Sequence, residues 1–590
     1  MKRIRIGLMA LAVIGSIHVN ATEIMKLSEI RAGMTGTGRT VFAGTDTGTF
    51  SFKVLGFIEK FAPGKNLIIV DLITPRLEGS GVVAGMSGSP VYIDDKLIGA
   101  VAYGFNFSKK PIGGVTPIEE ILASSEHRSP GYSVDISNIQ MNFDPQSTER
   151  IGSLIRDELV RRSTATPVPE IVPIRLVGAS RGIHPSALGP LASMFTPVSS
   201  LQVSRKLDGT HPSDELFRIH PADAAAVPLI RGDFEYSASG TVTHVDGKKV
   251  YLFGHPFFNL GTVNFPLHKG EVVAIVPSYQ NSFRLTASRN QIGTVTQDRF
   301  SCLQAELGDG PEMIPMKVFL KRRNRSFNLE MVDHPLLTPA LTAVSLENIF
   351  VAEYQQYGFN SIRVRGRIFV EGEKNIVVDD LYSGTAAFRE FSNLIMAIQF
   401  FIMNNPERRV KIQKLDFEIT GSEVVRRSRL ENVILDKNVY APGESIRAKL
   451  HFRNERGNQV SEETGLRAPN LKPGSEFYVL VGDKDEIIRF DSKNIKSNYF
   501  PGRLSHLVRA INNLRKNNRL YFKVMTPASG LFVSGFEYSH LPPSMRSVLE
   551  YNSESNNQSR IRYSTLAEYQ MELPAVINGK KLFKLRIKER

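Results

Sequence analysis

Residues 79–91 read Gly-Ser-Gly-Val-Val-Ala-Gly-Met-Ser-Gly-Ser-Pro-Val, a stretch in which Ser87 stands between glycines on both sides. Glycine adopts the backbone conformations of tight turns at little steric cost, so the pattern predicts a turn that exposes the serine hydroxyl and lets backbone N–H groups converge beside it. Such donors stabilise the oxyanion that forms when a serine attacks a peptide carbonyl, and Gly85 and Ser87 are the expected donors. A Gly-Ser-Gly string is more often only a loop, so the flanking sequence is needed to distinguish a catalytic turn from an ordinary loop.

The segment that follows Ser87 favours the chemical interpretation. Residues 90–93 and 97–105 are β-rich runs separated by the polar turn Asp-Asp-Lys, which predicts a hairpin. A strand and hairpin directly after the nucleophile is the context found in chymotrypsin-like serine peptidases. Together with the strands predicted at 49–57 and 67–72, this hairpin makes residues 22–122 an antiparallel half-barrel that carries the serine.

A serine nucleophile needs a general base, usually a neutral histidine that can take up the hydroxyl proton. His255 stands out among the 12 histidines because Gly-His-Pro follows the strand predicted at 250–253. Residues 171–380, with further strands at 240–243, 271–276 and 316–320, form the partner half-barrel. Residues 123–170 are a linker with a helix predicted at 147–161. The alternative is that His255 is a buried structural histidine.

Two motifs resemble one known family. Residues 85–90, with the strand at 96–101 behind them, are similar to the nucleophile region of the SpoIVB peptidase family, self-cleaving sporulation signalling serine peptidases of chymotrypsin-like type. The stretch 240–255 begins with Gly-Thr-Val-Thr, ends in Gly-His, and is similar to the segment that leads into that family's catalytic histidine. The family places its histidine segment first, whereas Ser87 precedes His255 here. The resemblance, which covers roughly residues 30–122 and 238–336, therefore implies a circularly permuted double half-barrel.

The resemblance also implies a triad acid about fifteen residues before the serine. That spacing falls on Leu72, so we nominate the adjacent Asp71, although a shift of one residue along a strand turns a side chain to the opposite face. Asp246 and Asp298 are the alternatives. Met86 stands where trypsin-like enzymes carry an aspartate that pairs with a freshly cut N-terminus, so activation through that ion pair is excluded.

The first 21 residues have the pattern of an export signal. A positive start is followed by an apolar stretch at 6–17 and by the small-residue site Val-Asn-Ala, which predicts cleavage after Ala21 and location in the periplasm or cell envelope. The alternative, a membrane anchor, needs about 20 apolar residues, and this run is shorter. Cleavage removes three positive charges and lowers the net charge from +14 to +11. A basic exported protein is compatible with weak contact to anionic membrane surfaces, and nucleic acid is not expected as a partner.

Cysteine and metal chemistry find no support in the sequence. Cys302 is the only cysteine, so the exported fold has no internal disulfide and no CxxC pair for zinc, and no HExxH motif occurs. We therefore expect no cofactor and no metal.

The last third of the chain differs from the rest. Residues 381–410 are a helical connection, with a helix predicted at 386–403 that carries too many polar residues for a membrane span. Residues 411–590 contain a Pro-Gly turn that leads into an alternating strand at 446–452, which is typical of immunoglobulin-like sandwiches. A helical insertion is predicted at 504–517. Domains of this type commonly bind other proteins, so we expect contacts with other envelope proteins here.

The sequence thus predicts a mainly β protein: a permuted chymotrypsin-like double half-barrel followed by a C-terminal immunoglobulin-like β-sandwich. The expected function is that of an exported serine endopeptidase that cleaves a protein or peptide substrate, or itself, through Ser87 and His255. The rival hypothesis is a catalytically inactive envelope scaffold or binding protein that retains the peptidase fold. An outer-membrane barrel is disfavoured because regular amphipathic strands of about ten residues do not recur.

Overall fold

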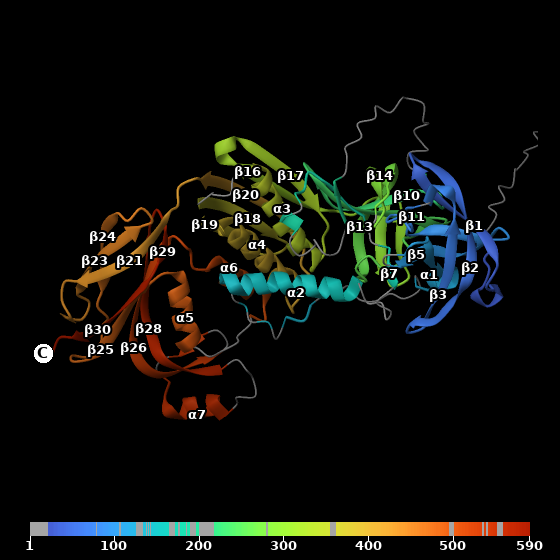
Figure 1. Cartoon of the computed structure of the whole chain (residues 1–590). Coiled ribbons are helices and arrows are strands. Elements are labelled where there is room, and N and C mark those ends of the chain that lie inside the picture. The colour runs from blue at the N-terminus through green and yellow to red at the C-terminus, as the bar shows by residue number, and fades with distance from the viewer. Residues whose placement is uncertain are drawn as a thin grey trace, which may run out of the picture.

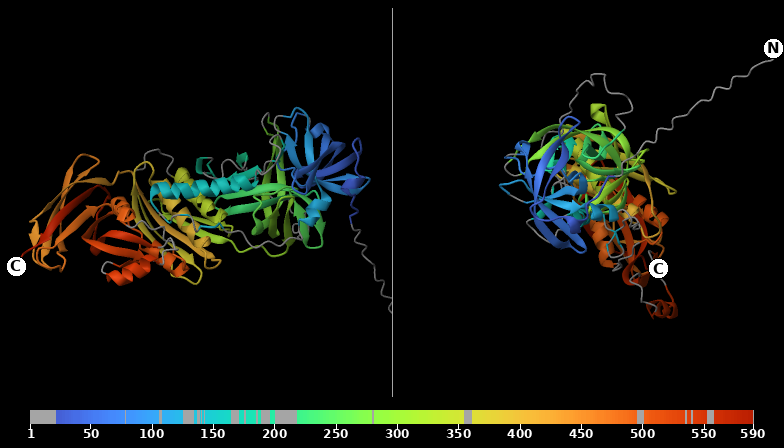
Figure 2. Two further views of the ribbon diagram at one scale, coloured as in Figure 1. Left: turned by 90° about the horizontal axis from the view of Figure 1, so that it is seen from below. Right: turned by 90° about the vertical axis from the view of Figure 1, so that its right-hand side faces the viewer.

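The computed structural model describes residues 22–589, apart from 78, 106–107, 125–133, 137–138, 140, 142, 164–170, 175–176, 185, 189–195, 200–217, 279–280, 354–360, 495–500, 534–535, 539–540 and 552–557. The predicted export signal therefore lies outside the described residues. Two β-barrels occupy one end of an elongated molecule, a sheet covered by helices lies in the middle, and a β-sandwich forms the other end (Figures 1 and 2). The predicted fold class, mainly β with a barrel pair and a sandwich, is confirmed.

The first barrel is complete within the N-terminal segment. Its strands are β1 (Thr35–Ala43), β2 (Asp46–Ala62), β3 (Lys65–Ile73), β4 (Ser89–Ile93), β5 (Lys96–Phe105) and β6 (Ile112–Pro117). Pairing of β4 with β5 closes them into a ring in the order β1-β2-β3-β6-β5-β4. The segment predicted as a half-barrel is thus a closed six-stranded barrel. The short helix α1 (Ile118–Ala123) follows it.

The second barrel repeats this plan. Its strands are β10 (Ala224–Gly232), β11 (Glu235–Asp246), β12 (Lys249–Leu252), β13 (Gly261–Val276), β14 (Phe283–Arg299) and β15 (Cys302–Leu307). They close in the order β10-β11-β12-β15-β14-β13, which is the strand order of the first barrel. Ser87 and His255 both lie on the connection between the third and fourth strands of their barrels. Two further strands, β8 (Val177–Arg181) and β9 (Thr196–Ser199), extend the second barrel beside β11.

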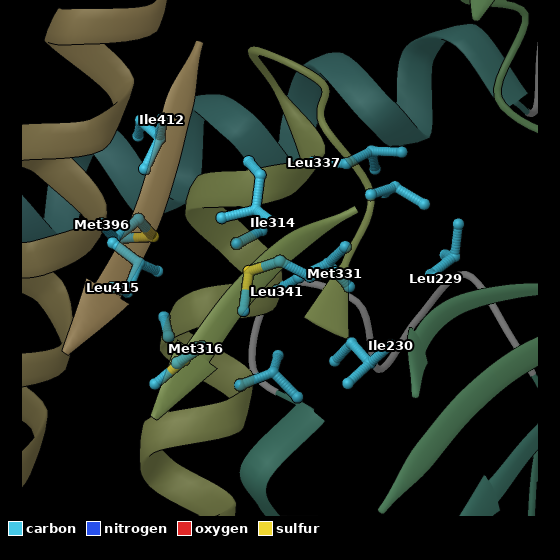
Figure 3. Close-up of a cluster of buried hydrophobic side chains, with 14 of the residues drawn as sticks. Leu229, Ile230, Ile314, Met316, Met331, Leu337, Leu341, Met396, Ile412 and Leu415 are labelled. Atoms are coloured by element: carbon cyan, nitrogen blue, oxygen red, sulfur yellow. The ribbon is translucent and has the colours of Figure 1, made fainter. Parts of the chain in front are cut away.

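A central sheet continues from the second barrel, because β17 pairs with β10. Its strands are β16 (Ile314–Leu320), β17 (Arg325–Met331), β18 (Ser361–Val370), β19 (Ile376–Ser383) and β20 (Ile412–Ser422). The helices α2 (Pro145–Ser163), α3 (Leu337–Glu353) and α4 (Ala387–Met403) pack with it. Leu229 and Ile230 of the barrel share one apolar core with Met331, Leu341 and Met396 (Figure 3). The second barrel and the central sheet are therefore one packing unit.

The helices predicted at 147–161 and 386–403 correspond to α2 and α4. α4 buries phenylalanine and isoleucine side chains against the sheet, which accounts for its apolar composition. Among the described residues, no helix combines the length and the hydropathy needed to cross a bilayer.

The boundary predicted at residue 411 differs from the structure. β20 pairs in parallel with β16 and antiparallel with β18, so residues 412–422 complete the central sheet and are not part of the sandwich. Alternation of buried and exposed residues marks β20 as a strand but does not identify the strand with which it pairs.

The C-terminal unit is a β-sandwich, as predicted. One sheet has the order β24-β23-β21-β29, and the other has the order β22-β30-β25-β26-β27, with β28 paired to β26. The bounds are β21 (Arg427–Leu435), β22 (Val439–Tyr440), β23 (Ser445–Asn454), β24 (Gln459–Arg467), β25 (Glu476–Gly482), β26 (Arg519–Val533), β27 (Phe536–Tyr538), β28 (Gln558–Glu572), β29 (Val576–Asn578) and β30 (Lys580–Ile587). Helices α5 (Lys484–Asn494) and α7 (Pro543–Tyr551) belong to this unit. Helix α6 (Leu504–Asn512), which lies where a helix was predicted, instead packs on α4 and β19 of the central sheet.

The placement of β20 is testable at Phe417, which is fully buried and packs edge-to-face on Phe391 of α4 with ring centroids 5.7 Å apart. Phe417→Ala is expected to lower the free energy of unfolding by about 3–5 kcal/mol. Hydrogen exchange is expected to rise in β16 and β18 and to stay unchanged in β21–β30. Val377→Ala, at a 58% exposed position of the same sheet, is the control and should have little effect. A rise confined to the sandwich would contradict the assignment.

Candidate active site

Ser87 lies on the turn between β3 and β4, as its glycines predicted. Gly85 and Gly88 have φ angles of +96° and +93°, a region that L-residues rarely adopt, so both positions require glycine. The prediction that the turn exposes the serine hydroxyl is wrong for this state of the chain: Ser87 is 0% exposed. The Ser87 Oγ has no hydrogen-bond partner among the described residues, although such buried groups are normally paired.

The backbone of the turn fits the predicted oxyanion hole. The Met86 amide bonds to the Val83 carbonyl at 3.0 Å, whereas the flanking amides of Gly85 and Ser87 donate to no acceptor in the described part of the chain. The Arg284 amide donates to the Ala84 carbonyl at 2.9 Å, which fixes the peptide plane that carries the Gly85 N–H. The N–H groups of Gly85 and Ser87 are therefore free to donate hydrogen bonds to an oxyanion, as an oxyanion hole requires.

The turn packs against the second barrel. The Thr241 amide of β11 donates to the Ser87 carbonyl at 2.7 Å, and the Thr243 hydroxyl donates to the Gly88 carbonyl at 2.8 Å. A Cβ at position 88 would stand 2.0 Å from the Thr241 oxygen and 2.5 Å from the Phe253 nitrogen. Only glycine allows the turn to reach β11 and β12 at this distance.

His255 follows two residues in left-handed conformations. Phe253 and Gly254 both have a φ of +72°, and for a phenylalanine this conformation is strained. Strain of this kind is concentrated at functional sites because the surrounding structure must hold it in place.

The protonation state of His255 follows from its contacts. Its Nδ1 lies 2.8 Å from the Pro256 carbonyl, which only accepts, so Nδ1 carries the proton and Nε2 is the free base. Burial lowers the pKa of the imidazole from 6.5 to about 4, and the Pro256 hydrogen bond opposes part of this shift. The neutral ring with a bare Nε2 is the form that a general base needs, and Nε2 has no partner among the described residues.

The turns that carry the two predicted residues pack on the same part of β5. The Gly88 amide donates to the Val101 carbonyl at 2.8 Å, and Cβ atoms of Ala100 and Ala102 lie 3.1 Å from the Cβ position of Gly254. The ring of Tyr103 lies edge-on to His255 with centroids 6.4 Å apart. Ser87 and His255 therefore share one interface between the barrels, but they are not hydrogen-bonded to each other in this state.

The nomination of Asp71 finds no support in this geometry. The neighbours Val70 and Leu72 point into the first barrel, so the side chain of Asp71 lies on the opposite face of β3. The Nδ1 of His255 is taken by the Pro256 carbonyl instead of a carboxylate. Asp246 is exposed at the turn between β11 and β12.

Asp298 of β14, the other alternative, is fully buried beside the histidine loop. Its carboxylate accepts the amides of Phe257 and Phe258 at 2.8 Å and that of Leu260 at 3.2 Å. Burial raises the pKa of this carboxyl, while the backbone donors favour its charged form. Asp298 thus positions the loop that carries His255 without contacting the imidazole.

Arg284 of β14 is a feature that the sequence did not indicate. Its side chain is 1% exposed and donates to the Val41 carbonyl at 2.9 Å and to the hydroxyls of Thr40 and Thr241 at 3.1 and 2.7 Å. No carboxylate pairs with it within the described residues, and burial lowers its pKa to about 9. The Thr241 hydroxyl in turn donates to the Gly85 carbonyl at 3.2 Å, so Arg284 braces the serine turn from the second barrel.

Other reactive groups are absent from this interface as described. Burial raises the pKa of the Cys302 thiol to about 12, which keeps it protonated and unreactive. Across the described ranges, no three His, Cys, Asp or Glu side chains converge as metal ligands do.

Among the comparisons with known proteins, a match was found for the segment that forms the first barrel. The model of the SpoIVB peptidase S55 family matches residues 7–122, which include Ser87 and all six strands of that barrel. The resemblance inferred from the Ser87 motif is thus confirmed for this segment, and at the level of the family it supports a serine peptidase. The match ends before the second barrel and therefore does not cover His255. No curated protein and no solved structure matches the chain.

The neutral state of His255 is testable by NMR. The unfolded chain binds a proton near pH 6.5 and the native chain only near pH 4, so stability falls as the pH drops through this interval. We expect the ¹⁵N and ¹³C shifts of His255 to report a neutral ring protonated at Nδ1 at pH 5.5. The same resonance in the urea-unfolded chain, where burial no longer lowers the pKa of the ring, serves as the comparison. An imidazolium at position 255 at pH 5.5 would contradict the geometry.

The positioning role of Asp298 is testable by Asp298→Asn. The amide nitrogen of asparagine cannot accept, so at least one of the three backbone donors loses its partner at a cost of about 1–3 kcal/mol. We expect faster hydrogen exchange at residues 257–260 and a shifted His255 resonance. Asp246→Asn is the matched control and should change neither measurement. Unchanged exchange in Asp298→Asn would refute the assignment.

Proposed function

We propose that this protein is an exported serine endopeptidase of the SpoIVB type, with Ser87 as nucleophile and His255 as general base. The observation that carries the proposal is the docking of two equivalent turns. Each connects the third and fourth strands of its barrel, one carries the buried Ser87 Oγ and the other the free Nε2 of His255. Two barrels with one strand order bring these turns together, although the serine comes first in the chain.

The groups of this interface account for acyl transfer. His255 Nε2 accepts the hydroxyl proton as Ser87 Oγ attacks a peptide carbonyl, and the amides of Gly85 and Ser87 stabilise the oxyanion. The proton on Nε2 then passes to the leaving amine, and water hydrolyses the acyl-enzyme by the same steps. The Pro256 carbonyl orients the imidazole, a task that a triad assigns to a carboxylate. A dyad of this kind is expected to be slower than a full triad, because a carbonyl stabilises the imidazolium less than a carboxylate does.

Location and partners belong to the same proposal. The tripartite pattern at residues 1–21 supports export to the periplasm or envelope. The substrate is a protein or peptide, and the C-terminal sandwich is the part of the chain available for contacts with other envelope proteins. The net positive charge supports weak contact with anionic membrane surfaces.

A specific observation favours the rival function, an inactive scaffold with the peptidase fold. Ser87 is inaccessible, and no hydrogen bond joins its Oγ to His255 in the described state. A pseudoenzyme would keep this arrangement permanently, whereas a latent peptidase would open it.

Labelling with a fluorophosphonate separates the two functions. Wild-type protein is expected to form a covalent adduct at Ser87 and to cleave a denatured protein substrate, and Ser87→Ala is expected to lose both by about 10³-fold or more. Ser51→Ala, at an exposed position of β2 in the same barrel, should behave like wild type. Equal fragment patterns for wild type and Ser87→Ala, with no adduct under any condition, would leave the scaffold as the function.

A further inference from the structure

One short strand occupies an unusual place beside the candidate active site. β7 (Ile171–Pro173) comes after the linker and pairs antiparallel with Tyr103, Gly104 and Phe105 of β5. One edge of β5 is paired with β6. The other edge is paired with β4 only up to Val101, and β7 continues along it from Tyr103 onward. β7 therefore fills the edge that the serine turn leaves open.

The hydrogen bonds place the end of this strand next to the serine turn. The Gly88 amide donates to the Val101 carbonyl at 2.8 Å, and the Ile174 amide donates to the next carbonyl, that of Ala102, at 2.9 Å. A register shift at Ala102 in the pairing with β6 accompanies this arrangement. Because β7 runs from Phe105 toward Ala102, its carboxyl end leads toward Ser87.

β7 also lies beside a neighbour of the histidine. Pro173 is paired with Tyr103, and the ring of Tyr103 lies edge-on to that of His255. An extended chain on this edge therefore runs beside a residue that packs on His255, and its carboxyl end leads toward the serine turn. This is the path that a scissile peptide must take if Ser87 and His255 are to act on it.

A cavity beside the serine turn is lined in part by residues of this strand. It measures about 340 Å³ and is lined by Ala84 of the serine segment, Gly104 of β5 and residues 172–174. Ile174 is 4% exposed and belongs to the same apolar cluster as Val83 and Met86. An aliphatic side chain at this position is therefore buried in the apolar core of the first barrel, to which the serine turn also contributes.

We propose that the edge of β5 from Ala102 to Phe105 is a binding site for an extended polypeptide with an aliphatic residue at the position of Ile174, and that the chain's own residues 171–174 are its resident occupant. The inference rests on the proposed function, because it makes this edge the substrate site. Strand addition supplies affinity through backbone hydrogen bonds, and the cavity supplies specificity. A tethered occupant acts at an effective concentration of roughly millimolar, so a free substrate must displace it.

If β7 were a purely structural strand of the barrel, its removal would have different consequences. A structural strand leaves a collapsed or unfolded edge when it is removed. A resident occupant leaves an edge that binds a free peptide of the same sequence.

The test uses the full-length mature chain with Ser87→Ala, so that cleavage does not interfere. Ile174→Asp places a charge in the buried position and is expected to release β7, which increases hydrogen exchange at 102–105 and 171–174. Ile73→Asp makes the same substitution at a 54% exposed position of β3 in the same barrel and is the matched control, with β7 expected to stay paired. If Ile174→Asp fails to fold, Ile174→Ala provides a milder release.

The released edge is then probed with the peptide acetyl-Ile-Val-Pro-Ile-amide. We expect it to bind Ile174→Asp about ten- to hundredfold more tightly than the chain without that substitution, and to restore protection at 102–105. The same peptide with an N-methyl group on its last residue lacks the donor to Ala102 and should bind at least about tenfold more weakly. Release of β7 without peptide binding, or equal binding of the two peptides, would overturn the proposal.

A second measurement separates this proposal from the peptidase function. With Ser87 intact, Ile174→Asp is expected to raise the rate of fluorophosphonate labelling about ten- to hundredfold, and the peptide is expected to suppress it. Selective peptide binding without any labelling retains the binding site and rejects the peptidase. Labelling that the peptide does not suppress retains the peptidase and rejects the binding site.

Discussion

The contact between the serine turn and strands β11 and β12 is the constraint on which the rest of the site depends. Gly88 brings its backbone so close to Thr241 and Phe253 that no side chain fits at that position. This approach joins the two barrels through backbone hydrogen bonds of Ser87 and Gly88, and it places the Ser87 hydroxyl inside the interface. The same contact orients the Gly85 and Ser87 amides and brings His255 to the neighbouring segment of β5. A site built in this way is assembled by packing, so its geometry is determined by the relative position of the barrels.

Burial at this interface sets the protonation of the groups it encloses. The imidazole of His255 is neutral because charging it without a partner is costly, and the Pro256 carbonyl selects its tautomer. Asp298 is compensated by backbone donors and Arg284 by hydroxyl and carbonyl acceptors. Each charge therefore holds a piece of backbone in place: Asp298 the loop after His255, and Arg284 the turn before Ser87. The charged groups of the site thus position backbone segments, whereas Ser87 Oγ and His255 Nε2 have no hydrogen-bond partner among the described residues.

The order of the barrels and the location of β7 are linked. Because the serine barrel comes first, the chain must leave it, cross the linker and enter the second barrel, and on this path residues 171–174 run along β5. A strand that continues the edge next to Ser87 closes the site from within. The burial of Ser87 is thus compatible with a latent peptidase, and the central sheet and sandwich, at the far side of the second barrel (Figure 1), leave the serine barrel at a free end of the molecule.

Much of this architecture was readable in the residues. The glycines around Ser87, the hairpin after it, and the Gly-His-Pro after a strand predicted the two turns, because glycine and alternating apolar residues impose local conformation whatever the rest of the chain does. The helices at 145–163 and 387–403 and the β-rich C-terminal domain followed from the same local patterns. Local patterns do not specify which strands pair with each other or which surfaces pack together. Contacts between residues far apart in the chain close each barrel and make β20 part of the central sheet. They also turn Asp71 away from the barrel interior and bury Arg284 against Thr40, Val41 and Thr241. Tertiary structure alone decided these, because burial and strand pairing depend on which surfaces meet, and the same strand pattern satisfies several partners equally well.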